Sequence, residues 1–384
     1  MNALAPHYSR FRVADRLLLT GHSHQAWPDV AFEAQQRAWL DAAEWVDDKW
    51  ERAQMQAAHV QMHWKRLLGD ADGSVALGQN THELVTRLLS ALPLRARPKL
   101  VTTNGEFHTI RRQLERLREE GIDVVRISAR PADSLADRLA QAVDDRTACA
   151  LVSSVLFETA EIVPDLEHLA RACDKHGAAL LVDAYHHVNV VPFDILELGL
   201  GQAFVTGGGY KYCQLGEGNA YLRVPEGCRL RPVLTGWYAE FAALERAATR
   251  AGVAYGEGAA AFAGATYDPT AHYRAAAVFD FHVEQGLVPA RLRAINRHQT
   301  DLLKREFEAL GIDPALAHVE PMPEARRAGF LAIRTPRAGD VVRAVRERGV
   351  HTDFRGDVLR LGPAPYLSDA QLSEAVHDVG AAIR

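Results

Sequence analysis

The chain has 384 residues, of which 48% are hydrophobic and 24% charged, a composition typical of a globular protein with a sizeable core. Its formal net charge of −5 and the lack of a polybasic block argue against nucleic acid or a membrane surface as a partner. The N-terminal stretch has no signal-like apolar core and no run is long enough to span a membrane, so we expect a cytoplasmic location.

A long helical pattern covers residues 30–68 and ends at Gly69. Amphipathic helices and short apolar strands then alternate along the chain. The predicted helices cover residues 81–92, 109–121, 133–143 and 165–177. The predicted strands cover residues 99–103, 123–128, 148–155, 178–184, 203–207 and 219–224. This alternation is typical of an α/β domain whose mostly parallel sheet carries helices on both faces.

The pattern changes after about residue 270, where longer helices appear. The predicted helices of this part cover residues 270–286, 289–311, 338–349 and 368–383. Its predicted strands cover residues 328–335, 350–356 and 357–362. We predict a smaller α+β domain over 271–384, a large domain over 49–270, and an N-terminal segment, 1–48, that packs with the small domain.

Two charged residues follow buried strands. Asp183 ends the strand in "LLVDAYHHV", with His186 three residues later, and Lys211 follows the strand in "FVTGGGYK". Alone, Asp183 fits a helix N-cap or a surface carboxylate, and Lys211 fits an exposed turn. Together they suit pyridoxal 5'-phosphate (PLP), whose aldehyde forms a Schiff base with a lysine and whose ring nitrogen is kept protonated by an aspartate. Ligands of parallel sheets bind at this edge, so the pair predicts PLP as cofactor.

Two further stretches suit the rest of such a cofactor. Asn80 and Thr81, in "GQNTHEL", lie where a loop meets a helix, so a hydroxyl and backbone N–H groups can face a phosphate. A plain N-cap is the ordinary interpretation of Thr81. Phe107, in "TTNGEFHTI", lies at a strand end where its ring can stack on the pyridine, although it also fits the core.

The order of N-T, E-F-H, D-x-x-H, G-Y-K and a late arginine resembles fold-type-I PLP enzymes of the class V aminotransferase group, and among them kynureninase. D-x-x-H followed by Y-K-Y is the most specific part, and "GW" at 236–237 and "PAPYL" after "LRLG" add to it. The resemblance runs over about residues 17–370. It implies a large domain with a mostly parallel seven-stranded sheet flanked by helices, and a smaller α+β C-terminal domain.

The resemblance also implies roles for single residues. Lys211 is similar to the Schiff-base lysine, Asp183 to the partner of the pyridinium, and His186 to a histidine that helps to hold the cofactor. Phe107 matches the ring-stacking position, and Thr81, with Asn80, matches the phosphate-binding position. Tyr210 matches a tyrosine that is proposed as an acid.

Other implied roles concern the substrate and a second subunit. Trp237 and Thr266 match positions that the neighbouring subunit supplies to the phosphate, which implies a homodimer with a shared active site. Arg360 resembles the arginine that binds the substrate α-carboxylate, a task that suits a bidentate guanidinium. A surface strand position is its ordinary interpretation, and Arg355 is an alternative clamp.

The chain departs from the kynureninase pattern near the substrate. "LLLTGHSHQAWP" replaces a "GNSLG"-like turn, and "HTIRRQ" follows Phe107 in place of a proline-containing run. These departures retain the residues for the cofactor and leave the substrate open. They also make His22, His24 and His108 candidates for polarising a substrate carbonyl.

We therefore predict an enzyme whose substrate is a small molecule, an amino acid, and the leading hypothesis is hydrolytic Cβ–Cγ cleavage of kynurenine or a related γ-keto amino acid. A class V aminotransferase is the alternative, because it needs the same lysine, aspartate and arginine. Cysteine desulfurase chemistry is disfavoured because residues 229–384 contain no cysteine, and the cysteines at 149, 173, 213 and 228 predict neither a disulfide nor a metal site. The sequence has no strand-linked G-x-G-x-x-G motif, so a dinucleotide-binding protein is disfavoured. The presence of Lys211 and Asp183 argues against a protein that only binds and does not catalyse.

Overall fold

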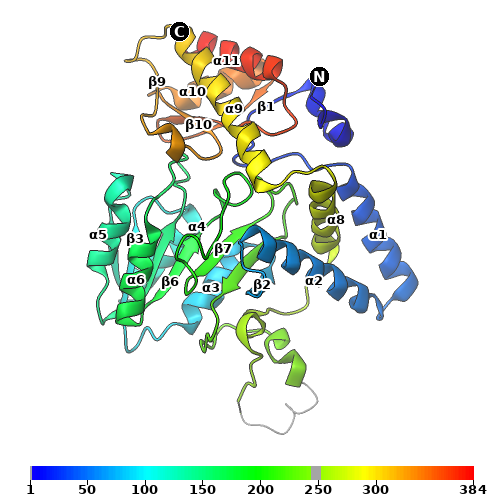
Figure 1. Ribbon diagram of the computed structural model, residues 1–384, viewed down its shortest axis with the longest axis vertical. Coiled ribbons are helices and arrows are strands. Elements are labelled where there is room, and N and C mark those ends of the chain that lie inside the picture. The colour runs from blue at the N-terminus through cyan, green and yellow to red at the C-terminus, as the bar shows by residue number, and fades with distance from the viewer. Residues whose placement is uncertain (1, 244–251) are drawn as a thin grey trace.

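The computed structural model describes residues 2–243 and 252–384 (Figure 1). A large domain surrounds a seven-stranded sheet, and a smaller domain with a four-stranded sheet lies above it in this view. Both chain termini lie at the upper end, beside the small domain. None of the helices in the described residues combines the length and the apolar character needed to cross a membrane.

The large sheet has the strand order β2-β8-β7-β6-β5-β3-β4. β8 runs antiparallel to both of its neighbours, and the other pairs are parallel. The strands are β2 Ser74–Gly78, β3 Lys99–Thr103, β4 Asp123–Ile127, β5 Thr147–Ser153, β6 Ala179–Asp183, β7 Phe204–Gly208 and β8 Ala220–Val224. This mostly parallel seven-stranded sheet confirms the predicted fold class.

Helices cover both faces of this sheet. They are α3 Thr81–Ala91, α4 His108–Glu119, α5 Leu135–Ala142 and α6 Leu166–His176. Leucines of α5 and α6 share one hydrophobic core with Val152 of β5, whereas α3 and α4 share another core with the adjacent Leu151. Successive residues of a strand point to opposite faces, so a continuously apolar strand supplies both cores.

The helical pattern predicted over residues 30–68 forms two helices, α1 Val30–Trp45 and α2 Lys49–Leu67. They are separated at Val46, whose φ of 48° is incompatible with a right-handed helix. α8, Thr270–Glu284, lies beside α1 and α2 (Figure 1), and its Phe279 joins the core of the large domain.

The small domain is built on an antiparallel sheet of order β12-β13-β10-β9. Its strands are β9 His318–Val319, β10 Leu331–Arg334, β12 Asp353–Arg355 and β13 Val358–Leu361, and its helices are α9 Pro289–Ala309, α10 Ala338–Glu347 and α11 Asp369–Ile383. The N-terminal β1, Leu17–Leu18, pairs in parallel with β11, Val350–His351. Leu4, Tyr8 and Leu19 lie in the core of this domain, although the domain boundaries themselves stay a prediction.

Candidate active site

The parallel strands β6 and β7 bring Asp183 and Lys211 to the same edge of the large sheet. Asp183, the last residue of β6, lies opposite Thr206 of β7 in the register of the pair. Both Asp183 and Lys211 line a cavity of about 350 Å³. The glycines before the lysine are needed there, because a Cβ at Gly207 would lie only 2.8 Å from the hydroxyl of Tyr221. The crowded end of β7 thus requires glycine, and the chain continues from it to Lys211 in the cavity.

Lys211 is 4% exposed, and its amine is surrounded by rings. Its Nζ lies 2.8 Å from Nε2 of His186. The ring centroids of Tyr185, Phe107 and Tyr210 lie 4.4, 5.2 and 5.7 Å from the same atom. Burial lowers the pKa of Lys211 to about 7, against the opposing charge of Asp183. A large fraction of the amine is therefore neutral near pH 7, and only the neutral amine is a nucleophile.

Asp183 presents a free carboxylate oxygen to this cavity. Its Oδ1 accepts a hydrogen bond from the backbone N–H of Tyr185 at 2.9 Å, and no residue in the described part of the chain donates to Oδ2. Burial raises the pKa of Asp183, which means that a cationic partner is needed to hold the carboxylate ionised. Nearby, Nδ1 of His186 is buried and has no hydrogen-bond partner among the described residues. The free oxygen of Asp183 fits a group that carries a protonated ring nitrogen.

The N-terminus of α3 faces the same cavity. Asn80 caps this helix through its side-chain oxygen, which accepts a hydrogen bond from the backbone N–H of Glu83 at 3.0 Å. Thr81 begins the helix, and Gln79, Asn80, Thr81 and Tyr210 all line the cavity. The first N–H groups of a helix have no partner within it and carry partial positive charge. This end of the cavity therefore suits a phosphate.

An aromatic wall closes another side. Phe107, the N-cap residue of α4, meets the ring of Phe157 edge-on, with centroids 5.4 Å apart. His108 lies against both rings, and burial lowers its pKa. Its Nδ1 is buried and has no hydrogen-bond partner within the described chain. This wall is hydrophobic, with one unsatisfied ring nitrogen beside it.

Glu106, next to this wall, received no role from the sequence. It is 2% exposed, and its carboxylate accepts hydrogen bonds from Oγ1 of Thr103 at 2.6 Å and from the hydroxyl and amide of Ser153 at 2.6 and 3.2 Å. Burial raises its pKa to about 7. Its position, as an acidic residue between an apolar strand and the start of a helix, was the sequence signal by which it could have been found. Because Ser153 pairs with Asp183 across β5 and β6, Glu106 supports the back of the cavity.

Arg360 of β13 is 2% exposed, so it is not a surface strand residue. Its Nε and Nη2 donate to the two oxygens of Asp353 at 2.8 and 2.6 Å, and its Nη1 donates to the carbonyl of Phe157 at 2.8 Å. Arg360 does not line the cavity itself, whereas Phe157 does. Sequence reasoning missed Asp353, whose only signal is the register that places it opposite Arg360 in the β12–β13 pair.

The structure separates the two histidines of the N-terminal turn. His22 is fully buried, with Nε2 2.8 Å from Oδ1 of Asp353, and burial lowers its pKa to about 4. It therefore supports the Asp353–Arg360 pair and does not line the cavity. His24 is exposed and stacks on Tyr210, with ring centroids 4.8 Å apart. Of the two, His24 lies closer to the cavity lining.

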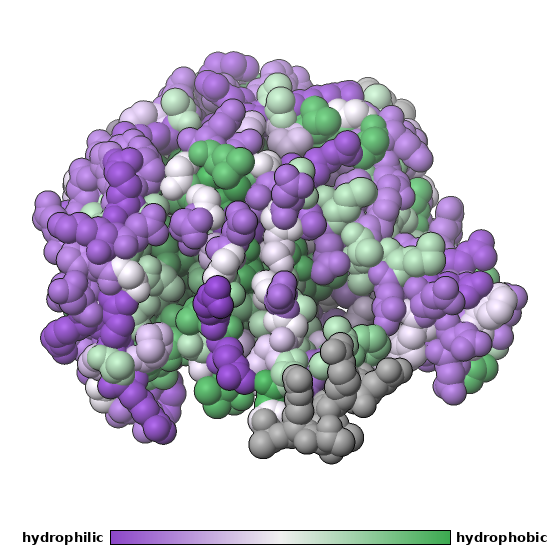
Figure 2. All heavy atoms as spheres, turned by 60° about the horizontal axis from the view of Figure 1, so that its bottom comes forward, coloured by the Kyte–Doolittle hydropathy of each residue, from purple (hydrophilic) through white to green (hydrophobic). Residues whose placement is uncertain are grey.

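Trp237 and Thr266 lie outside this cavity. Trp237 is 44% exposed, and its Nε1 donates to Oγ1 of Thr266 at 3.2 Å. Thr266 lines a separate, larger hollow of about 1290 Å³ between α2, β2 and residues 257–267. Figure 2 shows the end of the molecule that is lower in Figure 1, where hydrophobic side chains appear between polar ones. The two residues are thus placed on an open face and not beside Lys211 of their own chain.

Comparisons with known proteins agree with this geometry. A family model for the kynureninase C-terminal domain matches residues 292–379. A kynureninase from Deinococcus radiodurans is 28% identical over 326 residues, which cover 83% of this chain and 76% of that protein. A kynureninase from Pseudomonas fluorescens is 27% identical over an alignment of 402 positions, covering 99% and 92%. An uncharacterized aminotransferase from Bacillus subtilis is 20% identical over 347 residues, covering 89% and 88%.

Solved structures share the fold. A C-DES variant with glycine covalently linked to its PLP cofactor has a TM-score of 0.84 at 16% identity and covers 98% of both chains. The cystine C-S lyase C-DES in complex with its product cysteine persulfide has a TM-score of 0.81 at 16% identity, covering 96% of this chain and 98% of that chain. The fold-type-I architecture and the resemblance to kynureninase, both predicted from the sequence, are therefore confirmed.

Proposed function

We propose that this chain is a PLP-dependent enzyme whose cofactor occupies the cavity between α3, β6 and β7. One observation carries the proposal: a buried lysine whose pKa is lowered to about 7 and a half-buried aspartate with a free oxygen line the same cavity of about 350 Å³. When bound, PLP supplies an aldehyde for the lysine amine and a ring that withdraws electrons from the substrate Cα. The α3 N-terminus is oriented to receive its phosphate.

The residues around the cavity have distinct roles in this proposal. Asp183 holds a proton on the ring nitrogen, and Phe107 and His186 restrict the position of the ring. Lys211, with a pKa of about 7, accepts and returns the proton at the substrate Cα. Tyr210 stands beside Lys211 and is the proton donor for a carbanion at Cβ. Arg360 lies outside the cavity lining, so it recognises the substrate carboxylate by turning toward the cavity with the N–H groups that its bonds to Asp353 and Phe157 leave free.

The reaction that we propose is hydrolytic cleavage of the Cβ–Cγ bond of kynurenine or a related γ-keto amino acid. Water adds to the γ-carbonyl, the Cβ–Cγ bond breaks, and Cβ takes up a proton, which releases alanine and a carboxylic acid. The kynureninase relatives, which extend over as much as 99% of this chain, support this reaction class. The family model supports it too, because residues 292–379 include Arg360. His24 and His108 are the candidates for polarising the γ-carbonyl.

An aminotransferase is the second candidate, and the Bacillus subtilis relative favours it. Transamination uses the same lysine, aspartate and arginine, so these residues do not separate the two reactions. The products do: hydrolysis releases alanine, whereas transamination converts the amino acid into its keto acid.

We also propose that the enzyme is a cytoplasmic homodimer. Trp237 and Thr266 are hydrogen-bonded to each other on an open face. In a dimer, this pair from one subunit can reach the cavity of the other subunit. The exposed ring of Phe241 lies 5.5 Å from that of Trp237, between centroids, and the exposed Val233 and Leu234 lie close to them in sequence. Such a patch is typical of a protein–protein contact.

The test begins with reconstitution of the purified chain with PLP and borohydride reduction. We expect peptide mass spectrometry to find the cofactor on Lys211, and the Lys211→Ala variant to lose it. Lys99→Arg is the matched control, because Lys99 is also buried but is paired with Asp144 at 2.8 Å. It should leave the modification unchanged. Absence of PLP from the reconstituted wild-type chain would overturn the cofactor assignment.

The substrate is then tested with a panel of amino acids that includes L-kynurenine and 3-hydroxykynurenine. Release of alanine supports the hydrolase, and release of a keto acid supports the aminotransferase. If neither product forms from any γ-keto amino acid while PLP is bound, the hydrolase proposal is wrong and the cofactor assignment stands.

A further inference from the structure

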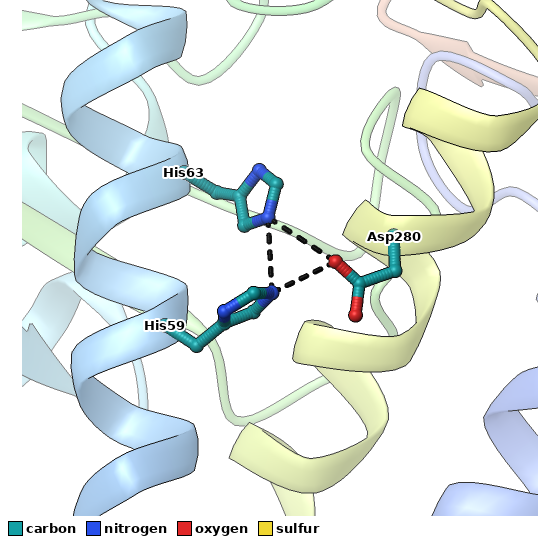
Figure 3. A group of neighbouring side chains, drawn as sticks. All are labelled: His59, His63 and Asp280. Atoms are coloured by element: carbon teal, nitrogen blue, oxygen red, sulfur yellow. Dashed lines mark hydrogen bonds and ion pairs between the residues drawn. The ribbon is translucent and has the colours of Figure 1, made fainter.

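We propose that His59, His63 and Asp280 form a binding site for a divalent transition-metal ion of the Zn²⁺ class. The two histidines lie on α2 and the aspartate on the facing helix α8, and all three side chains converge on one point (Figure 3). None of them lines the cavity that contains Lys211. The site is therefore separate from the proposed active site.

The distances between the ligand atoms suit a metal ion. Nε2 of His59 and Nε2 of His63 lie 3.2 Å apart, and they lie 2.8 and 3.6 Å from Oδ1 of Asp280. A triangle with these sides has a circumscribed radius of about 1.9 Å, while zinc keeps about 2.0–2.2 Å to histidine nitrogen and carboxylate oxygen. An ion slightly above the plane of the three atoms reaches all of them at bonding distance without movement of either helix.

The local structure holds the ligands in place. His59 and His63 are four residues apart, so they lie on one face of α2, one turn from each other. The ring of His63 stacks on Phe279 with centroids 4.7 Å apart and an angle of 13°, and it meets the ring of His59 in a T-shaped contact. The side chain of His63 is 6% exposed, whereas those of His59 and Asp280 are 36% and 54% exposed. Protein groups thus close one side of the site, and water can complete the coordination on the other.

The charges also favour a cation with nitrogen ligands. Two imidazole nitrogens face each other across 3.2 Å, and at most one of them can donate a hydrogen bond to the other in their neutral forms. A neutral imidazole keeps a lone pair on one of its ring nitrogens, which can bind an ion. Arg66 is the basic neighbour that opposes a cation, and Asp280 supplies the negative charge that compensates for it. Imidazole ligands select zinc, nickel or copper over magnesium and calcium.

An ion at this site would join two helices that are distant in the sequence. α8 also carries Arg274, whose Nε donates to the carbonyl of Leu215 at 2.7 Å and whose Nη2 donates to that of Glu217. These two residues belong to the segment that follows Lys211, and Glu217 lines the cavity. Metal binding therefore stabilises the helix that holds this segment, and the folded chain should melt at a higher temperature with Zn²⁺ than without it.

The test is a competition titration of the chelator-treated full-length chain with Zn²⁺, followed by Co²⁺ spectroscopy. We expect one ion per chain at this site, a visible cobalt spectrum of low coordination number, and affinity at least tenfold weaker in His59→Ala and in Asp280→Asn. Both positions are exposed enough that the variants should fold, which circular dichroism checks.

His298→Ala is the matched control. Nε2 of His298 lies 3.0 Å from both oxygens of Asp369, which makes an exposed histidine–aspartate pair without a second histidine. This variant should bind Zn²⁺ like the wild type. The proposal is overturned if the wild type and both His59→Ala and Asp280→Asn bind Zn²⁺ with equal affinity, because the ion would then lie elsewhere, for example at the half-buried thiol of Cys228.

Discussion

Asp353 holds the Arg360 guanidinium, and its replacement by asparagine perturbs that contact without changing the size of the side chain. The carboxylate accepts two hydrogen bonds from Arg360, at 2.8 and 2.6 Å, and lies 2.8 Å from Nε2 of His22. An amide can accept only one of the two arginine hydrogen bonds, because its nitrogen is a donor. Asp353→Asn therefore leaves a buried guanidinium without its counter-charge.

The magnitude follows from burial. The Arg360 side chain is 3% exposed, and removal of one partner from a buried ion pair costs about 3–5 kcal/mol. Asp353 is 22% exposed and asparagine retains one hydrogen bond, so we expect the lower end, about 3 kcal/mol. A carboxylate-binding arginine that loses its anchor should also lower kcat/KM for the amino-acid substrate by tenfold or more, which is about 1.4 kcal/mol.

The assay compares urea unfolding of Asp353→Asn with that of Asp357→Asn. Asp357 makes an equivalent pair with Nη1 of Arg334, at 2.7 and 2.8 Å, but its side chain is 49% exposed. An exposed pair contributes about 1 kcal/mol or less, so this control should unfold close to the wild-type midpoint. Equal urea midpoints for the two variants would show that burial does not increase the contribution of the Asp353–Arg360 pair to the free energy of unfolding.

A second readout separates electrostatics from simple destabilisation. The charge of Asp353 raises the pKa of Lys211. Asp353→Asn should therefore shift the pH at which the Lys211 amine becomes reactive to a lower value. If the pH profile of PLP capture stays unchanged while stability falls, Asp353 has only a structural role.

Four further predictions concern the cavity. Capture of PLP by the cofactor-free chain, trapped with borohydride, should rise through a midpoint near pH 7, because burial lowers the pKa of Lys211 to about 7. Since the unfolded chain then binds more protons than the folded chain between about pH 7 and about pH 10, the Lys211 contribution to the free energy of unfolding should rise with pH across that window. Asp183→Asn should lower kcat by about 100-fold or more, a loss of about 2.7 kcal/mol, while PLP is still fixed to Lys211. Tyr210→Phe should slow turnover by about 10²–10⁴-fold without loss of the cofactor, as expected for a proton donor, and unchanged turnover would assign that proton elsewhere.

Most of the sheet was predictable because β3, β4, β5 and β6 are short apolar runs, each with an amphipathic helix before it, and β7 and β8 are recognisable as apolar runs alone. β2 was missed, since "SVALG" follows Gly73 directly and pairs only with β8, about 146 residues later, in an antiparallel register that no local pattern indicates. The break between α1 and α2 was also missed. Apolar periodicity continues through the break, and only the backbone of Val46 interrupts the helix.

The candidate site divides in the same way. Asp183 and Lys211 were predictable because each lies at or just beyond the end of its own strand, and parallel strands end at one edge. Asp353 was not, because its importance depends on the register that places it opposite Arg360. The His59–His63 spacing is visible in the sequence, but Asp280 joins it only through the packing of α2 against α8. Sequence reasoning could not predict these contacts, because tertiary packing sets them and the local direction of the chain does not.

In the proposed active site, Phe157 connects the group that recognises substrate with the wall that faces the cofactor. Its carbonyl accepts a hydrogen bond from Arg360 of the small domain, and its ring meets Phe107 edge-on, 5.4 Å between centroids. Residues on both sides of it, Val155 and Ala160, share a small apolar cluster with β10 and β13. A carboxylate that draws Arg360 toward the cavity must therefore move this segment or break the bond to its carbonyl. If Arg360 binds the substrate carboxylate as proposed, the contact between the two domains selects which substrates fit, and this contact can change while Lys211 and Asp183 keep their places.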